Sequence, residues 1–216
     1  RFNYRKGTII WDEWVPDLRW TNRNYSVIKS FDIETGSTIQ LGSATRYYSP
    51  AISKKGDQIV SIEQRADHTF YVVVLDTAGS VIHSIKSPDN QFVQHPQWME
   101  MDTALVVSLN NLTGEYLYSY SFATRTWREL YHAGFDDISF PFVSGSEIYF
   151  GSTVSGIDNI FSFNMASREL SKITSAEFGA FEASVSETGR LLVFADYHSD
   201  GYQAASVEIK PQRFSP

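Results

Sequence analysis

The feature that most constrains this chain of 216 residues is a repeat of about 44 residues. A proline or its counterpart opens a short strand-like segment four times, at Pro50, Pro96, Pro141 and Ala183, in steps of 46, 45 and 42 residues. Self-similarity with a period of about 40–45 residues is typical of four-stranded propeller blades. The repeat therefore predicts a chain built from consecutive blades.

Two further markers keep the same phase. Turn-forming stretches lie at 32–36, 76–79, 121–124 and 164–167, and an aliphatic residue stands nine positions after the first residue of each: Leu41, Ile85, Leu130 and Ile173. An apolar strand recurs at 8–11, 58–62, 104–107, 147–150 and 191–194, which gives five copies. Each unit then has a short first strand at the proline, an apolar second, an alternating third and an amphipathic edge strand.

No window of twelve or more residues combines a helical period with caps. A single unit cannot cover its apolar faces, whereas units stacked side by side cover one another. A β-sandwich is the alternative, but a sandwich does not require a recurring phase. We therefore predict an all-β fold, a β-propeller of about five four-stranded blades. It forms one domain over residues 1–216, with units at about 1–42, 43–88, 89–132, 133–175 and 176–210.

The two ends of the repeat are incomplete. No first strand is evident before Gly7, and the last unit stops after 203–209 without a fourth strand. One alternative is that residues 1–4 supply a strand to the last unit and close the ring. The other is that this sequence is a cut from a larger propeller. No targeting segment is present, so the sequence itself assigns no compartment.

Composition excludes several classes of function. The chain has no cysteine, which removes disulfides, thiolate zinc sites and cysteine nucleophiles. A net charge of −7 argues against a nucleic-acid partner, and no apolar run is long enough for this segment to insert into a membrane. The five histidines lack metal-ligand spacing, and we expect no metal and no cofactor. No serine-hydrolase elbow or phosphate loop occurs.

The best-preserved repeat is specific enough to suggest a family. Ser49-Pro50-Ala51-Ile52-Ser53-Lys54-Lys55-Gly56-Asp57-Gln58-Ile59-Val60, the following segment 70–79 and Ser186-Glu187-Thr188-Gly189 carry the pattern. It resembles the TolB-like, WD40-like propeller repeat of bacterial envelope proteins. The stretch from Trp11 to Tyr25 resembles an insertion between strands in exported, multidomain proteins of Bacteroidetes-type bacteria. The resemblance implies a periplasmic or cell-envelope/extracellular location and a longer parent protein.

Two sets of residues are candidates for recognition. In a propeller, residues just before each inner strand line one mouth of the tunnel; here we expect these binding residues to be Arg46, Tyr47, Tyr48, His95, Asp136, Asp137, Phe181 and Glu182. The second set is a candidate interface in the 11–25 insertion, where we expect the tryptophans to pack over their own blade or against a neighbouring domain: Trp11, Trp14, Arg19, Trp20 and Arg23.

The inner strands hold few acids, and Glu182 alone stands at an inner-strand start, whereas glycosidases use a carboxylate pair. We therefore expect a non-catalytic binding or scaffold domain that recognises a protein or peptide, or other domains of its parent chain. The alternatives are a substrate-gating propeller attached to a peptidase domain and a carbohydrate-active propeller.

Overall fold

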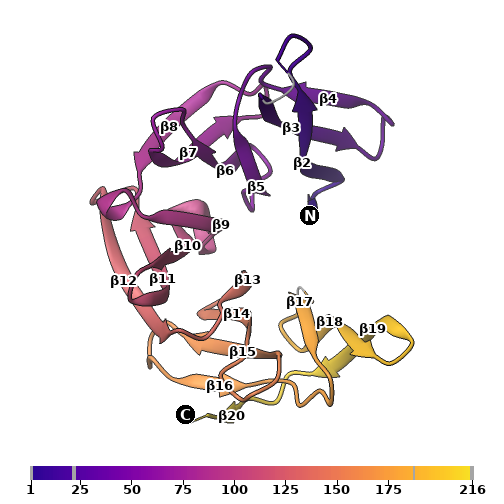
Figure 1. The fold of residues 1–216 in the computed structure, drawn as a ribbon. Helices are drawn as coiled ribbons and strands as arrows, with labels where there is room; N and C mark the ends of the chain where they lie inside the picture. The colour runs from indigo at the N-terminus through magenta and orange to yellow at the C-terminus, as the bar shows by residue number, and fades with distance from the viewer. Residues whose placement is uncertain (1, 21–22, 187, 215–216) are drawn as a thin grey trace. The chain divides into compact units, whose positions relative to one another are not determined.

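The computed structural model describes residues 2–20, 23–186 and 188–214, and it is built almost entirely from antiparallel strands (Figure 1). The strands form five sheets, and within each sheet neighbours in the chain are neighbours in space. This arrangement confirms the predicted all-β fold and the five-bladed β-propeller. We number the sheets as blades 1 to 5 along the chain.

The chain forms two compact units, residues 1–105 and 106–216, and each is described by itself. Blade 1 contains β1 (Phe2–Arg5), β2 (Thr8–Pro16), β3 (Asn24–Asp32) and β4 (Thr38–Leu41). Blade 2 contains β5 (Tyr47–Ile52), β6 (Gln58–Gln64), β7 (Phe70–Asp76) and β8 (Val81–Lys86). The short 3-10 helices η1 (Pro88–Asn90) and η2 (Glu100–Asp102) flank β9 (Phe92–Trp98).

Blade 3 continues from the first unit into the second through β9, β10 (Ala104–Asn111), β11 (Gly114–Ser121) and β12 (Thr126–Gly134). Blade 4 contains β13 (Ser139–Ser144), β14 (Glu147–Ser152), β15 (Asn159–Asn164), β16 (Leu170–Lys172) and the C-terminal β20 (Gln212–Arg213). Blade 5 contains β17 (Ala180–Val185), β18 (Leu191–His198) and β19 (Gly201–Glu208).

The apolar second strands of blades 2, 3 and 4 are buried on both faces, whereas β2 and β18 bury only Ile10 and Leu192. In β10 the five consecutive residues from Leu105 to Leu109 are all buried. In the first unit, Ile10 and Ile28 of blade 1 share a core with Ile59 and Val73 of blade 2. In the second unit, Tyr149 and Ile160 of blade 4 pack with Leu192 of blade 5. Stacked sheets thus cover the faces that no single blade could cover.

The start of the chain corrects the sequence analysis. Residues 2–5 form β1, which pairs with β2 from Phe2↔Trp11 to Arg5↔Thr8. The first strand of blade 1 therefore precedes Gly7, and residues 2–4 do not complete the last unit; residue 1 lies outside the described part. Sequence reasoning offered a strand at residues 1–4 but assigned it to the last unit, because a four-residue segment of alternating polar and aromatic side chains does not show which sheet it joins.

The stretch 11–25 is also not an inserted loop. Strands β2 and β3 continue through it and pair in an unbroken register from Thr8↔Asp32 to Pro16↔Asn24. Only 17–23 connects them, and positions 21–22 fall outside the described residues. Blade 5 has three strands among the described residues, as expected, while β20 pairs with β16 and extends blade 4.

The proline marker coincides with a repeated backbone feature, a residue with positive φ in the first strand of a blade. The residue before each marker has a left-handed backbone, with φ of 53° at Ser49, 49° at His95, 48° at Phe140 and 53° at Glu182. In β5, β13 and β17 the strand register shifts at this point, which is a β-bulge. Glu182 has this backbone although Ala183, not a proline, follows it, so the feature does not require the proline. A bulge bends the strand and re-aims nearby side chains.

Replacement of Ser49 tests this feature. A β-branched side chain is strained at positive φ, so Ser49→Val is expected to lower the free energy of unfolding by about 1–3 kcal/mol. Ser49→Gly removes the strain and should change it by well under about 1 kcal/mol. Urea unfolding of both variants measures the difference. Ser30→Val, in the extended strand β3, is the matched control; a Ser49→Val effect no larger than that control would contradict the interpretation.

Buried tyrosines make the fold sensitive to high pH. Burial, helped by the negative charge of Glu147, raises the pKa of Tyr149 to about 12. Its folded pKa lies above the value of about 10 for an unfolded tyrosine, so its contribution to stability is full below pH 10 and is lost as the pH rises towards 12.

We therefore expect the free energy of unfolding to fall between pH 10 and 12, and to fall less steeply in Tyr149→Phe. Urea unfolding across this range measures both slopes. The exposed Tyr4→Phe is the control. Equal slopes for the wild type and Tyr149→Phe would count against a buried, proton-holding Tyr149.

Candidate functional site

The predicted binding residues lie near one edge of their blades. Because the strands are antiparallel, the chain entering the first strand and the hairpin between the second and third strands lie at the same edge. In blade 2 this is seen where Tyr47, at the start of β5, pairs with Glu63, near the end of β6. We call this the entry edge. In each unit the predicted mouth residues lie either in the connection that precedes a first strand or within the first few residues of that strand.

The first-unit members of that set are Arg46, Tyr47, Tyr48 and His95. Arg46 lies just before β5, Tyr47 and Tyr48 open it, and His95 lies in β9 beside Pro96. The second-unit members are Asp136 and Asp137, in the connection before β13, and Phe181 and Glu182, at the start of β17. Tyr47 is buried and Glu182 exposed, so the set is not uniform in accessibility. Their role in binding stays a prediction.

In the second unit, blades 4 and 5 have four connections at the entry edge: 135–138, 153–158, 173–179 and 199–200. Backbone hydrogen bonds fix the second and third of them to blade 5: the Ala180 N–H of β17 donates to the Asp158 carbonyl at 2.9 Å, and the Tyr197 N–H of β18 donates to the Gly179 carbonyl at 2.9 Å. The Glu115 carboxylate accepts the Ile138 N–H at 2.7 Å and fixes the first connection. The four segments reach the same edge of the sheets, and we call them together the acidic edge.

Apolar side chains and carboxylates alternate on the acidic edge. Phe135 is 87% exposed and precedes Asp136 and Asp137. Ile157, 42% exposed, precedes Asp158, and Phe178, 53% exposed, follows Glu177. Asp200 completes the set in the fourth connection. None of the four segments contains Lys or Arg, and the nearest in sequence is Lys172, the last residue of β16.

In the first unit, the entry edge holds a cavity of about 310 Å³. It is lined by Asp12, Trp14, Asn24, Tyr25, Ser26, Arg46, Tyr48 and Gln64. Asp12 and Trp14 are two residues apart in β2, so their side chains lie on the same face of the strand. Trp14 pairs with Ser26 of β3, which therefore lies on that face of the hairpin too. Arg46 and Tyr48 come from the chain entering blade 2, and Gln64 ends β6. The cavity therefore lies between two adjacent blades of one unit.

Hydrogen bonds fix the walls of the cavity. Residues 45–47 run alongside Ser26 beyond the end of β4: the Ser26 N–H donates to the Thr45 carbonyl at 3.0 Å, and the Ser26 hydroxyl donates to the Tyr47 carbonyl. The Gln64 N–H donates to the Arg46 carbonyl at 3.2 Å. The bulge residue Ser49 donates its N–H to Asp12 at 3.3 Å. The repeated bulge thus contributes directly to the wall.

The tip of the β2–β3 hairpin is ordered by Asp17. Its carboxylate accepts the N–H groups of Arg19 at 2.8 Å and Trp20 at 3.2 Å, and the hydroxyl of Tyr25 at 3.2 Å. The backbone hydrogen bond from Arg19 is the largest cause that lowers the pKa of this carboxyl. The guanidinium of Arg23 lies 5.2 Å from the Tyr25 ring centroid. Tyr25, at the cavity, is therefore held from both sides.

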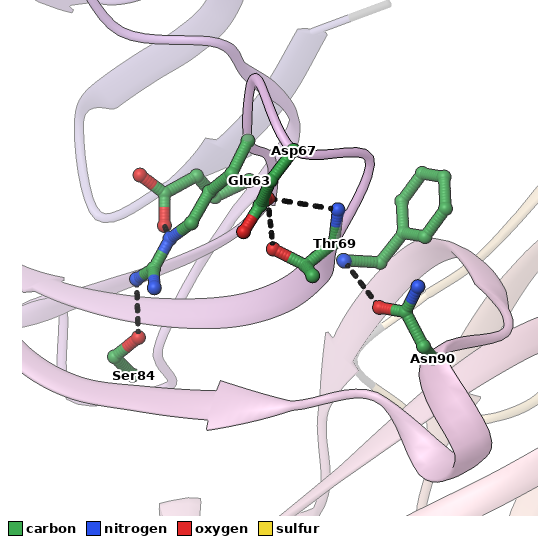
Figure 2. Close-up of polar contacts among 7 residues, drawn as sticks. Glu63, Asp67, Thr69, Ser84 and Asn90 are labelled. Carbon is green, nitrogen blue, oxygen red and sulfur yellow. Dashed lines mark hydrogen bonds and ion pairs between the residues drawn. The ribbon is translucent and has the colours of Figure 1, made fainter.

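The neighbouring β6–β7 hairpin is equally ordered (Figure 2). The guanidinium of Arg65 donates to Glu63 at 2.9 Å and to Ser84 at 3.1 Å, and it stacks 3.6 Å from the Tyr71 ring centroid. Asp67 accepts the N–H and hydroxyl of Thr69, which are the main causes that lower the pKa of its carboxyl. These contacts secure the turn that follows Gln64.

The tryptophan set is more exposed than expected. Trp11 is half-buried and its indole N–H donates to Glu13 at 3.3 Å. Trp14 is 71% exposed at the cavity, and Trp20 is 56% exposed with the Arg19 guanidinium 5.3 Å from its ring centroid. Sequence reasoning named Trp14, Arg46 and Tyr48 but missed Asp12, Asn24 and Gln64. Asp12 and Trp14, and likewise Asn24 and Ser26, are two residues apart and would share a face if they lay in strands. This signal was not used because 11–25 was interpreted as an insertion.

Among the described residues no three His, Asp or Glu side chains come together in a way that could hold a metal ion. No helix in this part of the chain is long and apolar enough to span a bilayer. Asp196 and His198 pair at 3.0 Å on β18, but no third His, Asp or Glu within the described ranges joins them.

Comparison with known proteins places the fold. No family model and no curated protein sequence matches the chain. Among solved structures, TolB from Acinetobacter baumannii superposes with a TM-score of 0.76 at 15% identity, over 97% of this chain and 53% of that one. The chain thus spans about half the length of that relative. The repeat resemblance and this likeness agree on a TolB-like propeller.

Enzymes share the same fold. An oligogalacturonate lyase in complex with manganese matches with a TM-score of 0.67 at 14% identity, over 96% of this chain and 64% of that one. The acylaminoacyl peptidase of Pyrococcus horikoshii matches with a TM-score of 0.62 at 14% identity, over 90% of this chain and 35% of that one. At these identities the likeness establishes architecture, and function has to be argued from the site.

Tyr48 offers a direct test of the cavity wall. Its hydroxyl oxygen is buried without a hydrogen-bond partner among the described residues, and burial raises its pKa. A buried unpaired hydroxyl costs about 1–3 kcal/mol, so Tyr48→Phe should raise the free energy of unfolding by about 1 kcal/mol. Urea unfolding at pH 7 measures this. Tyr25→Phe, which loses its bond to Asp17, should not stabilise; a destabilised Tyr48→Phe would show that the hydroxyl is paired.

Proposed function

We propose that this domain is a non-catalytic recognition module that binds a polypeptide segment carrying both cationic and apolar side chains. The observation that carries the proposal is the acidic edge, where exposed Phe135, Ile157 and Phe178 each stand beside a carboxylate. Aromatic side chains are enriched in protein interfaces and supply most of their binding energy. Carboxylates around them steer an oppositely charged partner and select against an acidic one.

The charge distribution favours such a partner. The second unit holds seven Lys and Arg against thirteen Asp and Glu, a net charge of −6, whereas the first unit holds eleven against twelve. Nearly all of the net charge of the chain therefore belongs to the unit with the acidic edge. A basic segment would be attracted to it, and an acidic segment repelled.

The same surface supports binding more than catalysis. Hydrolysis of a glycoside by a carboxylate pair requires one acid and one base facing each other, whereas the carboxylates of the acidic edge come from four separate connections. The substrate-gating alternative would use the domain in the same way, as a surface that selects polypeptides for a peptidase elsewhere in the parent protein. We also propose an envelope or periplasmic location and a longer parent protein, on the repeat resemblance.

Peptide binding tests the proposal. Three labelled twelve-residue peptides serve as probes: one of Lys and Leu, one of Glu and Leu, and one of Ser and Gly. We expect the Lys–Leu peptide to bind at least about tenfold more tightly than the other two, with affinity that falls as salt rises. Fluorescence anisotropy measures all three. Equal binding of the Glu–Leu peptide would contradict the charge argument.

Variants assign the binding to the acidic edge. The double variant Phe135→Ser/Phe178→Ser should weaken Lys–Leu binding by about tenfold or more, and Asp137→Lys/Glu177→Lys should abolish the preference for cations. Val81→Ser and Glu34→Lys, at exposed positions of the first unit, are the matched controls. Unchanged binding in both edge variants would overturn the proposal, as would peptide or glycoside hydrolysis that is lost in Glu182→Gln.

A further inference from the structure

We infer that the cavity of the first unit is a binding site for a saccharide. The inference rests on residues 1–105 alone and is independent of the polypeptide surface proposed above. Four of the lining residues have planar polar side chains, namely Asp12, Asn24, Arg46 and Gln64, and a fifth, Trp14, is an exposed indole at the same cavity.

The polar side chains have unused hydrogen-bonding capacity. Among the described residues, the side chains of Asn24, Arg46 and Gln64 make no hydrogen bond or ion pair. Asp12 accepts one bond, the 3.3 Å contact from the Ser49 N–H, through a single oxygen. Each carboxamide offers donors and an acceptor, the carboxylate offers acceptors, and the guanidinium offers a planar fork of donors. The contrast is Arg65, on the next hairpin, whose guanidinium already bonds Glu63 and Ser84 and stacks on Tyr71.

Hydroxyl groups match this set best. Two adjacent hydroxyls on a sugar ring each donate and accept, so a carboxamide, a carboxylate or a guanidinium can bond both at once. The C–H face of a pyranose is apolar and slightly positive, and it packs on the electron-rich face of an indole. A cavity with an aromatic side and a few convergent polar groups is the usual form of a small-molecule site.

The site is preorganised, which lowers the entropic cost of binding. Trp14 and Asn24 stand on paired strands whose register is unbroken, and Asp17 holds the end of that hairpin through its bonds to 19, 20 and 25. The carbonyl of Arg46 accepts the Gln64 N–H, which links the two residues across blade 2. Among the described residues, one carboxylate, that of Asp12, lines the cavity. Cleavage of a glycosidic bond ordinarily uses two, so the inferred role is binding.

Calorimetry with a defined panel tests the inference. The probes are soluble tetrasaccharides of glucose, xylose, N-acetylglucosamine and galacturonic acid, together with tetra-alanine as a peptide probe, each up to 5 mM in about 100-fold excess over the protein. We expect at least one tetrasaccharide to bind and tetra-alanine not to bind. If Arg46 contributes its charge, the galacturonate probe binds most tightly and loses this advantage in Arg46→Gln. Trp14, being exposed, should also report binding through a change of tryptophan fluorescence.

Trp14→Ala is expected to weaken saccharide binding by about tenfold or more, and Gln64→Ala to weaken it by several-fold. Trp20→Ala is the matched control, because Trp20 is exposed on the same hairpin but does not line the cavity. Unchanged melting temperatures confirm that the variants fold. The inference is overturned if no tetrasaccharide binds, if binding survives both Trp14→Ala and Arg46→Gln, or if tetra-alanine binds at this cavity instead. Loss of Lys–Leu peptide binding would leave this outcome unaffected.

Discussion

The structure depends on strands that are apolar on both faces. A strand such as β10, buried from Leu105 to Leu109, cannot lie in a sheet with one solvated side. Each sheet therefore needs an apolar neighbour, and a chain of similar units meets that need by stacking consecutive blades. The shared cores of blades 1 and 2, and of blades 4 and 5, are the result. Because the cores occupy the faces of the sheets, the edges are left to carry the function.

The fold was predictable from the sequence because its signals are local and repeated. Pro50, Pro96 and Pro141 marked the first strands, and glycine-containing turns marked the hairpins that follow. The same prolines did not reveal that the residue before each is left-handed, since Ser49, His95, Phe140 and Glu182 share no side-chain chemistry. Ser49, Phe140 and Glu182 do share a bulge, and a bulge is set by the pairing of two strands. The identity of the single residue does not encode it.

The candidate sites were only partly predictable for a related reason. Arg46, Tyr48 and Trp14 stood out as charged or aromatic residues at expected edges, but their partners depend on register. Asp12 joins Trp14 at the cavity only because β2 remains a strand as far as Pro16, and Asn24 joins them only because β3 begins there. On the second unit, Asp136 and Asp137 were identified, whereas Ile157 and Phe178 were not. Those two lie in hairpins and connections whose shared edge becomes visible only once the strands are paired.

In the two proposals the units use the same edge for different chemistry, and the local charge accounts for the difference. In the first unit, Arg46 and Asp12 carry opposite charges and line one cavity with the neutral amides of Asn24 and Gln64. Their electric fields largely cancel, so a ligand would be selected by directed hydrogen bonds. In the second unit, five carboxylates stand in connections without Lys or Arg, so their field adds up and reaches beyond single contacts. Exposed apolar side chains then supply the short-range energy that charge alone does not. One scaffold can thus present a site that selects by hydrogen-bond geometry and a surface that selects by charge, because the residues that differ lie outside the buried cores.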